Sequence, residues 1–112
     1  MTRAADERIR DILAAVERCI SYRDYLDSDH SAMAYDAILR NLAVIGEAVR
    51  ALPGEVKSEH PTTPWASIAG LRNVVIHEYF KINPDLIRDV VDNDLAALAE
   101  SLRDSSAGTG ME

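Results

Sequence analysis

The feature that most constrains this chain is a run of apolar residues spaced alternately three and four apart. The run is Tyr35, Ile38, Leu42, Ile45, Val49 and Leu52. This spacing places all six side chains on one face of an α-helix, in a seam suited to packing nearly parallel to another helix. The seam fits either the core of a bundle or a dimer interface. Because it is more regular than one short helix needs for internal packing, we expect it to contribute partly to dimerisation.

Weaker versions of this rhythm cover residues 6–26, 64–80 and 83–102, whereas no segment shows the alternation of a half-buried strand. Helix boundaries are marked by Pro53-Gly54 and by Asn83-Pro84, and Thr63 is expected to cap the helix that begins at Pro64. Residues 55–60 are expected to form one short helical turn. The sequence therefore predicts an all-α, up-and-down bundle of four to five helices. We expect a single domain over residues 1–104 and a flexible tail over residues 105–112.

Length and charge exclude several classes of protein. A chain of 112 residues makes one domain. Its single cysteine, Cys19, excludes an internal disulfide and is expected to be a small core residue. No segment approaches the roughly 20 apolar residues of a membrane span, and the N-terminus lacks the apolar centre of a signal peptide, so we expect a soluble, cytoplasmic protein. A net charge of −7 argues against broad nucleic-acid binding, so any such contact must be local or combine positive charge from two chains.

The octapeptide RNVVIHEY, residues 72–79, gathers polar residues among valines and isoleucines. Because each helical residue advances about 100°, Asn73 and His77 share one face, while Arg72 and Tyr79 share a neighbouring face. Arginine binds phosphate through two parallel hydrogen bonds, and a neutral imidazole accepts a proton near pH 6.5. This pair suits RNA cleavage at a 2′-hydroxyl, with His77 moving the proton and Arg72 stabilising the phosphate. That chemistry needs no metal and no other cofactor.

A purely structural role for the same residues is the alternative. Arg72 could pair with Glu47 or another carboxylate, His77 could bond a backbone carbonyl, and Tyr79 could lie half-buried with its hydroxyl in water. The spacing of the residues alone leaves both interpretations open.

Two longer stretches resemble a known family. The segment PWASIAGLRNVVIHEYF, residues 64–80, is similar to the signature of HepT-type toxins in the HEPN superfamily, whose motif is Arg, four residues, His, one residue and Tyr. Arg72, His77 and Tyr79 match it, and Asn73 fits the family's usual Arg-Asn pair. The segment AILRNLAVIGEA, residues 37–48, resembles the family's second helix, including Asn41 and Gly46-Glu47. The likeness spans about residues 5–103.

The resemblance implies a HEPN-like homodimer whose two Arg72-His77 motifs line one cleft and act as a metal-independent endoribonuclease. It also implies a partner, an MntA-type nucleotidyltransferase antitoxin, which silences the toxin by transferring AMP to Tyr79 in a type VII toxin-antitoxin system. Asn73, Glu47 and Asn41 are the expected supporting residues. Two copies of Arg72, helped by Arg40, would make the cleft locally positive. The alternative is a non-catalytic HEPN module that binds a nucleotidyltransferase or a nucleotide through the same surface.

Overall fold

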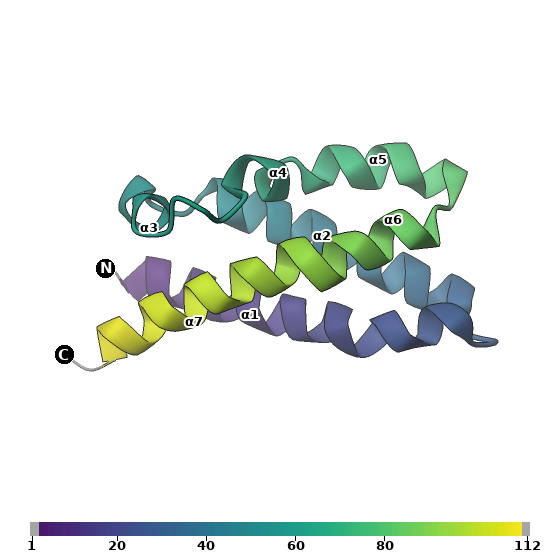
Figure 1. Cartoon of the computed structure of the whole chain (residues 1–112), viewed down its shortest axis with the longest axis horizontal. Coiled ribbons are helices and arrows are strands. Elements are labelled where there is room, and N and C mark those ends of the chain that lie inside the picture. The colour runs from purple at the N-terminus through teal and green to yellow at the C-terminus, as the bar shows by residue number, and fades with distance from the viewer. Residues whose placement is uncertain (1–2, 111–112) are drawn as a thin grey trace.

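The chain folds into a bundle of antiparallel helices, seen in a computed structural model (Figure 1). The structure describes the backbone of residues 3–110 and the side chains of residues 4–104. The helices are α1 (Arg3–Arg23), α2 (Ser31–Arg50), α3 (Gly54–Ser58), α4 (Trp65–Ala69), α5 (Leu71–Lys81), α6 (Pro84–Asp89) and α7 (Ala96–Gly110). No strand occurs within residues 3–110. The prediction of an all-α, up-and-down bundle is confirmed.

Four long segments run up and down the bundle (Figure 1). They are α1, α2, the α4–α5 pair, and a continuous rod in which a π-helical stretch, Val90–Leu95, joins α6 to α7. α2 packs against α1, α4 and α5, and the rod packs against α1. The start of α1 and the end of α7 lie at the same end of the molecule (Figure 1). Among the described residues, none of the helices has the length and apolar character needed to cross a membrane.

The seam on α2 lies inside the core of this single chain. Its six residues are at most 5% exposed, and they pack with the apolar faces of α1 and α7. The expectation that the seam contributes to dimerisation is therefore wrong, because its side chains are already covered by the chain's own helices. Cys19 is also buried in this core, as predicted, and burial raises the pKa of its thiol to about 12. The thiol therefore stays protonated at neutral pH.

Of the two helix starts predicted from capping residues, the one at Asn83-Pro84 is confirmed and the cap at Thr63 is not. Asn83 caps α6 by accepting a hydrogen bond from the backbone N–H of Leu86, and Pro84 occupies the first turn, as predicted. Thr63 does not cap α4, so that prediction is wrong. Its hydroxyl is buried instead against the hydroxyl of Ser101 on α7. A tertiary hydrogen bond has replaced the local one.

Two further segments differ in detail from the expected layout. The helix predicted over residues 64–80 is divided at Gly70 into α4 and α5. The indole N–H of Trp65 donates to the backbone carbonyls of Lys57 and His60, which ties the start of α4 to α3. At the C-terminus, α7 continues to Gly110, so helix covers most of the segment expected to be a tail. Residues 111 and 112 of that tail lie outside the described residues.

Candidate active site

The octapeptide lies on α5, and α5 rests mainly on α2. Gly46 of α2 makes this close packing possible. A Cβ added at Gly46 would lie 3.2 Å from the carbonyl oxygen of Ile68 and 3.4 Å from the backbone nitrogen of Arg72. Glycine lets the junction of α4 and α5 approach this closely, because any larger residue would push the backbone of Ile68 away by a few tenths of an ångström. The backbone of Arg72 is thereby held directly against α2.

Glu47, the residue after Gly46, meets the side chain of Arg72. The Arg72 guanidinium donates to the Glu47 carboxylate at 3.1 Å, with both side chains at least half exposed. Both residues line a hollow of about 540 Å³ between α1, α2 and the start of α5, together with Arg8 and Val44. The sequence stretches around Glu47 and Arg72, which are far apart in the chain, are thus brought together at this hollow.

His77 and Asn73 lie on another side of α5, and both are exposed. Within the described residues, the His77 side chain takes part in no hydrogen bond or ion pair, including any with Arg72. The five-residue separation along the helix turns the two side chains about 140° apart. A single chain therefore presents the two groups on different flanks of α5.

Tyr79 is exposed near the C-terminal end of α5. Its side chain is 58% exposed, and its ring meets the ring of Phe80 edge to face at a centroid distance of 5.0 Å. Its hydroxyl has no hydrogen-bond partner within the described part of the chain. An accessible phenol of this kind can be modified without unfolding the helix.

Asn41 lies in a different place from the other predicted site residues. Its amide nitrogen donates to the carbonyl of Ala37, one turn back on α2, and its amide oxygen accepts from the Arg18 guanidinium of α1 at 3.0 Å. Asn41 therefore contacts neither Arg72 nor His77 through a hydrogen bond. It links α1 to α2 on the outside of the bundle.

Two features of α5 were not predicted from the sequence. Tyr35, buried in α2, donates its hydroxyl hydrogen to the carbonyl of Glu78 at 2.9 Å and accepts the N–H of Asn83 at 3.0 Å. One side-chain oxygen of Glu78 is buried with no hydrogen-bond partner among the described residues. No pattern in the sequence pointed to the Tyr35 bonds, because Tyr35 lies more than 40 residues away from both partners in the chain.

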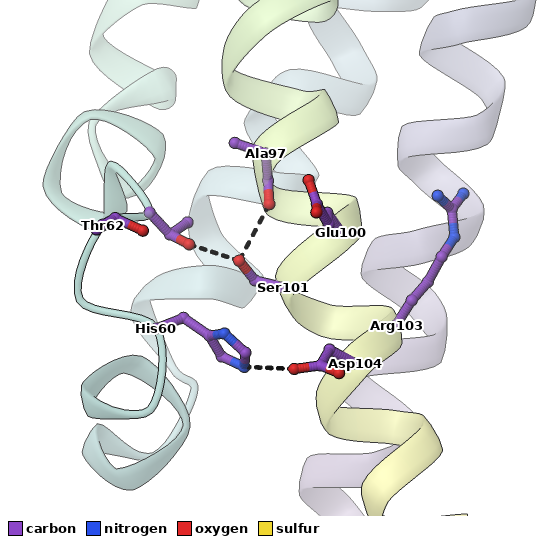
Figure 2. A pocket seen from close by; sticks show the side chains of 8 residues that line it. His60, Thr62, Ala97, Glu100, Ser101, Arg103 and Asp104 are labelled. Atoms are coloured by element: carbon purple, nitrogen blue, oxygen red, sulfur yellow. Dashed lines mark hydrogen bonds and ion pairs between the residues drawn. The ribbon is translucent and has the colours of Figure 1, made fainter.

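A second hollow lies between α7 and the segment that follows α3 (Figure 2). It has a volume of about 630 Å³ and contains His60, whose ring nitrogen lies 3.9 Å from the Asp104 carboxylate. No residue of the octapeptide lines it. In the described part of the chain, no three His, Cys, Asp or Glu side chains gather closely enough to hold a metal ion.

Comparison with known proteins identifies the family. The family described as "Ribonuclease HepT-like" matches residues 7–104. A Methanocaldococcus jannaschii protein named "Putative RNase MJ0127" is 35% identical over 101 residues, which cover 84% of this chain and 84% of that protein. The "Probable ribonuclease HepT" of Thermococcus cleftensis is 31% identical over 104 residues, which cover 88% and 92% of the two chains. No solved structure gives a significant match. The chain belongs to the HepT-like ribonuclease family.

Proposed function

We propose that this protein is a metal-independent endoribonuclease whose active site forms when two copies of the chain place their α5 helices across a shared cleft. The proposal rests on the exposure and position of the Arg72 and His77 side chains within one chain. Arg72 and His77 are both exposed on α5, but they lie on different flanks of the helix. In a dimer, the α5 helix of the facing copy would place its own His77 opposite Arg72 and its own Arg72 opposite His77.

The ion pair between Arg72 and Glu47 does not prevent phosphate binding. Both side chains are half exposed or more, and exposed pairs of this kind contribute only about 0.2–1 kcal/mol. A phosphate that accepts two hydrogen bonds from the guanidinium is a stronger partner than a solvated carboxylate. Glu47 therefore holds Arg72 in place without blocking it.

The reaction follows from these groups. One neutral His77 removes the proton from a ribose 2′-hydroxyl, whose oxygen forms a bond to the adjacent phosphorus. The bond from phosphorus to the 5′-oxygen breaks, and a protonated His77 of the facing copy gives that oxygen its proton. The products are a 2′,3′-cyclic phosphate and a 5′-hydroxyl. Arg72 stabilises the charge that gathers on the phosphate oxygens.

Exposed apolar side chains support the homodimer. Four large ones gather at the C-terminal end of α5 and just beyond it: Ile76, Tyr79, Phe80 and Ile82. Phe80 is 86% exposed. Apolar groups clustered in this way on a soluble chain mark an interaction site. A twofold interface would pack Ile76, Phe80 and Ile82 against their equivalents in the second copy.

The same exposure suits Tyr79 for adenylylation. In the proposed reaction its phenol oxygen forms a bond to the α-phosphorus of ATP, pyrophosphate leaves, and the phenol proton is released. The enzyme would be an MntA-type nucleotidyltransferase, which makes the pair a type VII toxin-antitoxin system. The added phosphate places negative charge and bulk near Arg72, where it would repel RNA. Tyr79 is then the switch that silences the ribonuclease.

The test of catalysis is cleavage of RNA by the purified protein in the presence of EDTA. We expect His77→Ala and Arg72→Gln to reduce cleavage at least 100-fold while the helical circular dichroism and the dimer mass stay unchanged. His60→Ala, which changes a histidine outside the motif, should keep full cleavage. Equal cleavage by wild-type protein and His77→Ala would refute the proposed role of His77.

Mass spectrometry tests the switch. Incubation with the nucleotidyltransferase and ATP should add AMP to wild-type protein, whereas Tyr79→Phe should take up none and remain an active ribonuclease. AMP found on the Tyr79→Phe variant would place the modification elsewhere. A non-catalytic module that binds the nucleotidyltransferase or a nucleotide is the second candidate function, because Arg72 and His77 do not meet within one chain. Wild-type protein that binds the nucleotidyltransferase but cleaves no RNA would establish it.

A further inference from the structure

A row of three adjoining hollows follows the outside of α1 and α2. It begins at the hollow that contains Arg72 and passes through two more hollows, of about 520 Å³ and 320 Å³. Val44 lines both the first and the second hollow, and Tyr22 and Ala37 line both the second and the third. The three hollows therefore adjoin one another. We call them together the α1–α2 groove.

The α1–α2 groove is positive on a protein that is acidic overall. Arg18 and Arg40 line its middle hollow, and no carboxylate of the described chain lines either that hollow or the third. Neither arginine forms an ion pair within the described residues. Other arginines are neutralised, because Arg23 pairs with Asp92 and Arg103 lies within 3.9 Å of Glu17. On a chain with net charge −7, two such arginines in one groove form a local anion site.

Asn41 orients one of these arginines. Its side-chain oxygen accepts from Nε of Arg18 at 3.0 Å, and its own amide is fixed by the Ala37 carbonyl at 2.8 Å. Only one of the five N–H groups of the guanidinium is used in this way. The two terminal nitrogens remain available for a phosphate. Asn41 thus acts as a positioning residue for Arg18.

Aromatic side chains follow the arginines along the groove. Tyr22 is half-buried between the second and third hollows, and Tyr25, in the third hollow, is 52% exposed. A positively charged groove combined with aromatic rings is the means by which many proteins hold single-stranded nucleic acid, with arginines on phosphates and rings stacked on bases. Bases in a duplex are already stacked on each other and cannot use these rings.

We infer that the α1–α2 groove binds the single-stranded part of the RNA substrate and leads it to Arg72. Arg18 and Arg40 contact backbone phosphates, and Tyr22 and Tyr25 stack on bases. The groove follows α2 from His30 to Ala51, which is about 30 Å at 1.5 Å per residue. It therefore spans several nucleotides on one side of the cleavage point. This inference rests on the proposed ribonuclease function for its substrate, although RNA binding can be measured apart from cleavage.

The test measures binding of a fluorescent single-stranded oligoribonucleotide to the full-length His77→Ala protein, so that the probe is not cut. Adding Arg18→Gln and Arg40→Gln together should weaken binding at least tenfold. It should also reduce the magnitude of the negative slope of log affinity against log salt by about 1.4, or about 0.7 for each phosphate that the protein no longer neutralises. Arg10→Gln is the matched control, because Arg10 is exposed on the same helix but lines none of the three hollows. It should leave the affinity within about twofold.

Two further measurements separate stacking from charge. Tyr25→Leu should weaken single-strand binding about tenfold without changing the salt slope. Asn41→Leu leaves both arginines in place but frees Arg18 to move, so it should weaken binding by less than the double arginine change. A fully paired duplex of the same sequence should bind the His77→Ala protein at least tenfold more weakly than the single strand.

The outcomes distinguish this inference from the proposed function. If wild-type protein cleaves no RNA but the arginine pair still controls single-strand binding, the groove stands and the ribonuclease proposal fails. If wild-type protein cleaves RNA and the double arginine variant binds and cleaves equally well, the groove is refuted. Loss of the dimer in the double arginine variant would show that this face joins two copies of the chain, which also refutes RNA binding there.

Discussion

Helices α2 and α5 lie side by side but are held in place in different ways. α2 buries eight residues along its length: Ala34, Tyr35, Ile38, Leu39, Leu42, Ile45, Gly46 and Val49. In α5 Leu71, at the first position, is fully buried, and Val74 and Val75 are partly buried against the core. Both helices are therefore stabilised by apolar area removed from water, but α5 has less such area than α2.

Contacts to its backbone also hold α5 in place. At its start, Gly46 lets the backbone of Arg72 approach α2 closely. At its end, the Tyr35 hydroxyl bonds the carbonyl of Glu78 and the N–H of Asn83. These backbone contacts let the side chains of Arg72, His77 and Tyr79 stay exposed. The neighbouring helix therefore positions the motif helix, and the motif residues themselves do not have to pack.

The largest effect is expected from the core of α2. Leu42 is fully buried, so Leu42→Ala should lower the free energy of unfolding by about 2–5 kcal/mol at any protein concentration. Phe80→Ala on α5 removes a larger side chain, yet Phe80 is 86% exposed. In dilute protein its free energy of unfolding should therefore change by no more than about 0.5 kcal/mol. Urea unfolding followed by circular dichroism measures both. Equal losses in dilute protein would contradict the contrast between the two helices.

The second-largest loss of stability is expected from adding a side chain at Gly46. An added methyl group lies 3.2 Å from the backbone oxygen of Ile68, and overpacking of this kind costs about 1–3 kcal/mol. The better helix propensity of alanine offsets up to about 1 kcal/mol of this cost. Gly46→Ala should therefore lower the free energy of unfolding by about 0–2 kcal/mol and reduce RNA cleavage, because Arg72 is displaced. Gly54→Ala is the control, since a Cβ there has no atom within 4 Å.

The buried apolar face of α2 and the start of α6 were both predictable from the sequence. The three- and four-residue spacing identified the buried face of α2, and proline with asparagine located the start of α6. These signals are local, because each is contained within a few residues of one helix. The pairing of Arg72 with Glu47, stated as one of two alternatives, is what the structure shows. Whether the pair also serves catalysis stays a prediction.

The contacts that position α5 were not predictable in the same way. Tyr35 was assigned only to the apolar seam, yet its hydroxyl reaches residues 43 and 48 positions further along the chain. Thr63 had the sequence context of a helix cap but bonds Ser101 instead. Such hydrogen bonds depend on how helices cross in space. No spacing within one segment specifies the crossing.

Removing the Tyr35 hydroxyl tests the far end of α5. Tyr35→Phe keeps the ring in the core but leaves the carbonyl of Glu78 and the N–H of Asn83 without their partner. Because these groups are only partly buried, we expect a loss of about 1 kcal/mol, at the low end for orphaned polar groups. Hydrogen exchange should show faster opening of residues 78–83 than of α2. Tyr25→Phe, which alters an exposed tyrosine, should leave both the stability and the exchange pattern unchanged.

The smallest effect on stability is expected at the pair that joins the two helices on their surface. Glu47→Gln removes the charge opposite Arg72, and both side chains are at least half exposed. We expect a loss of about 0.2–1 kcal/mol in the free energy of unfolding. That loss should disappear in about 1 M salt, where charges are screened beyond roughly 3 Å. Glu17→Gln, which removes a looser surface pairing with Arg103 at 3.9 Å, is the matched control and should lose no more. A loss above about 2 kcal/mol that persists at high salt would lie well beyond the range for exposed pairs. It would mean that the motif side chains fix α5 to α2, which contradicts the contrast between backbone and side-chain attachment.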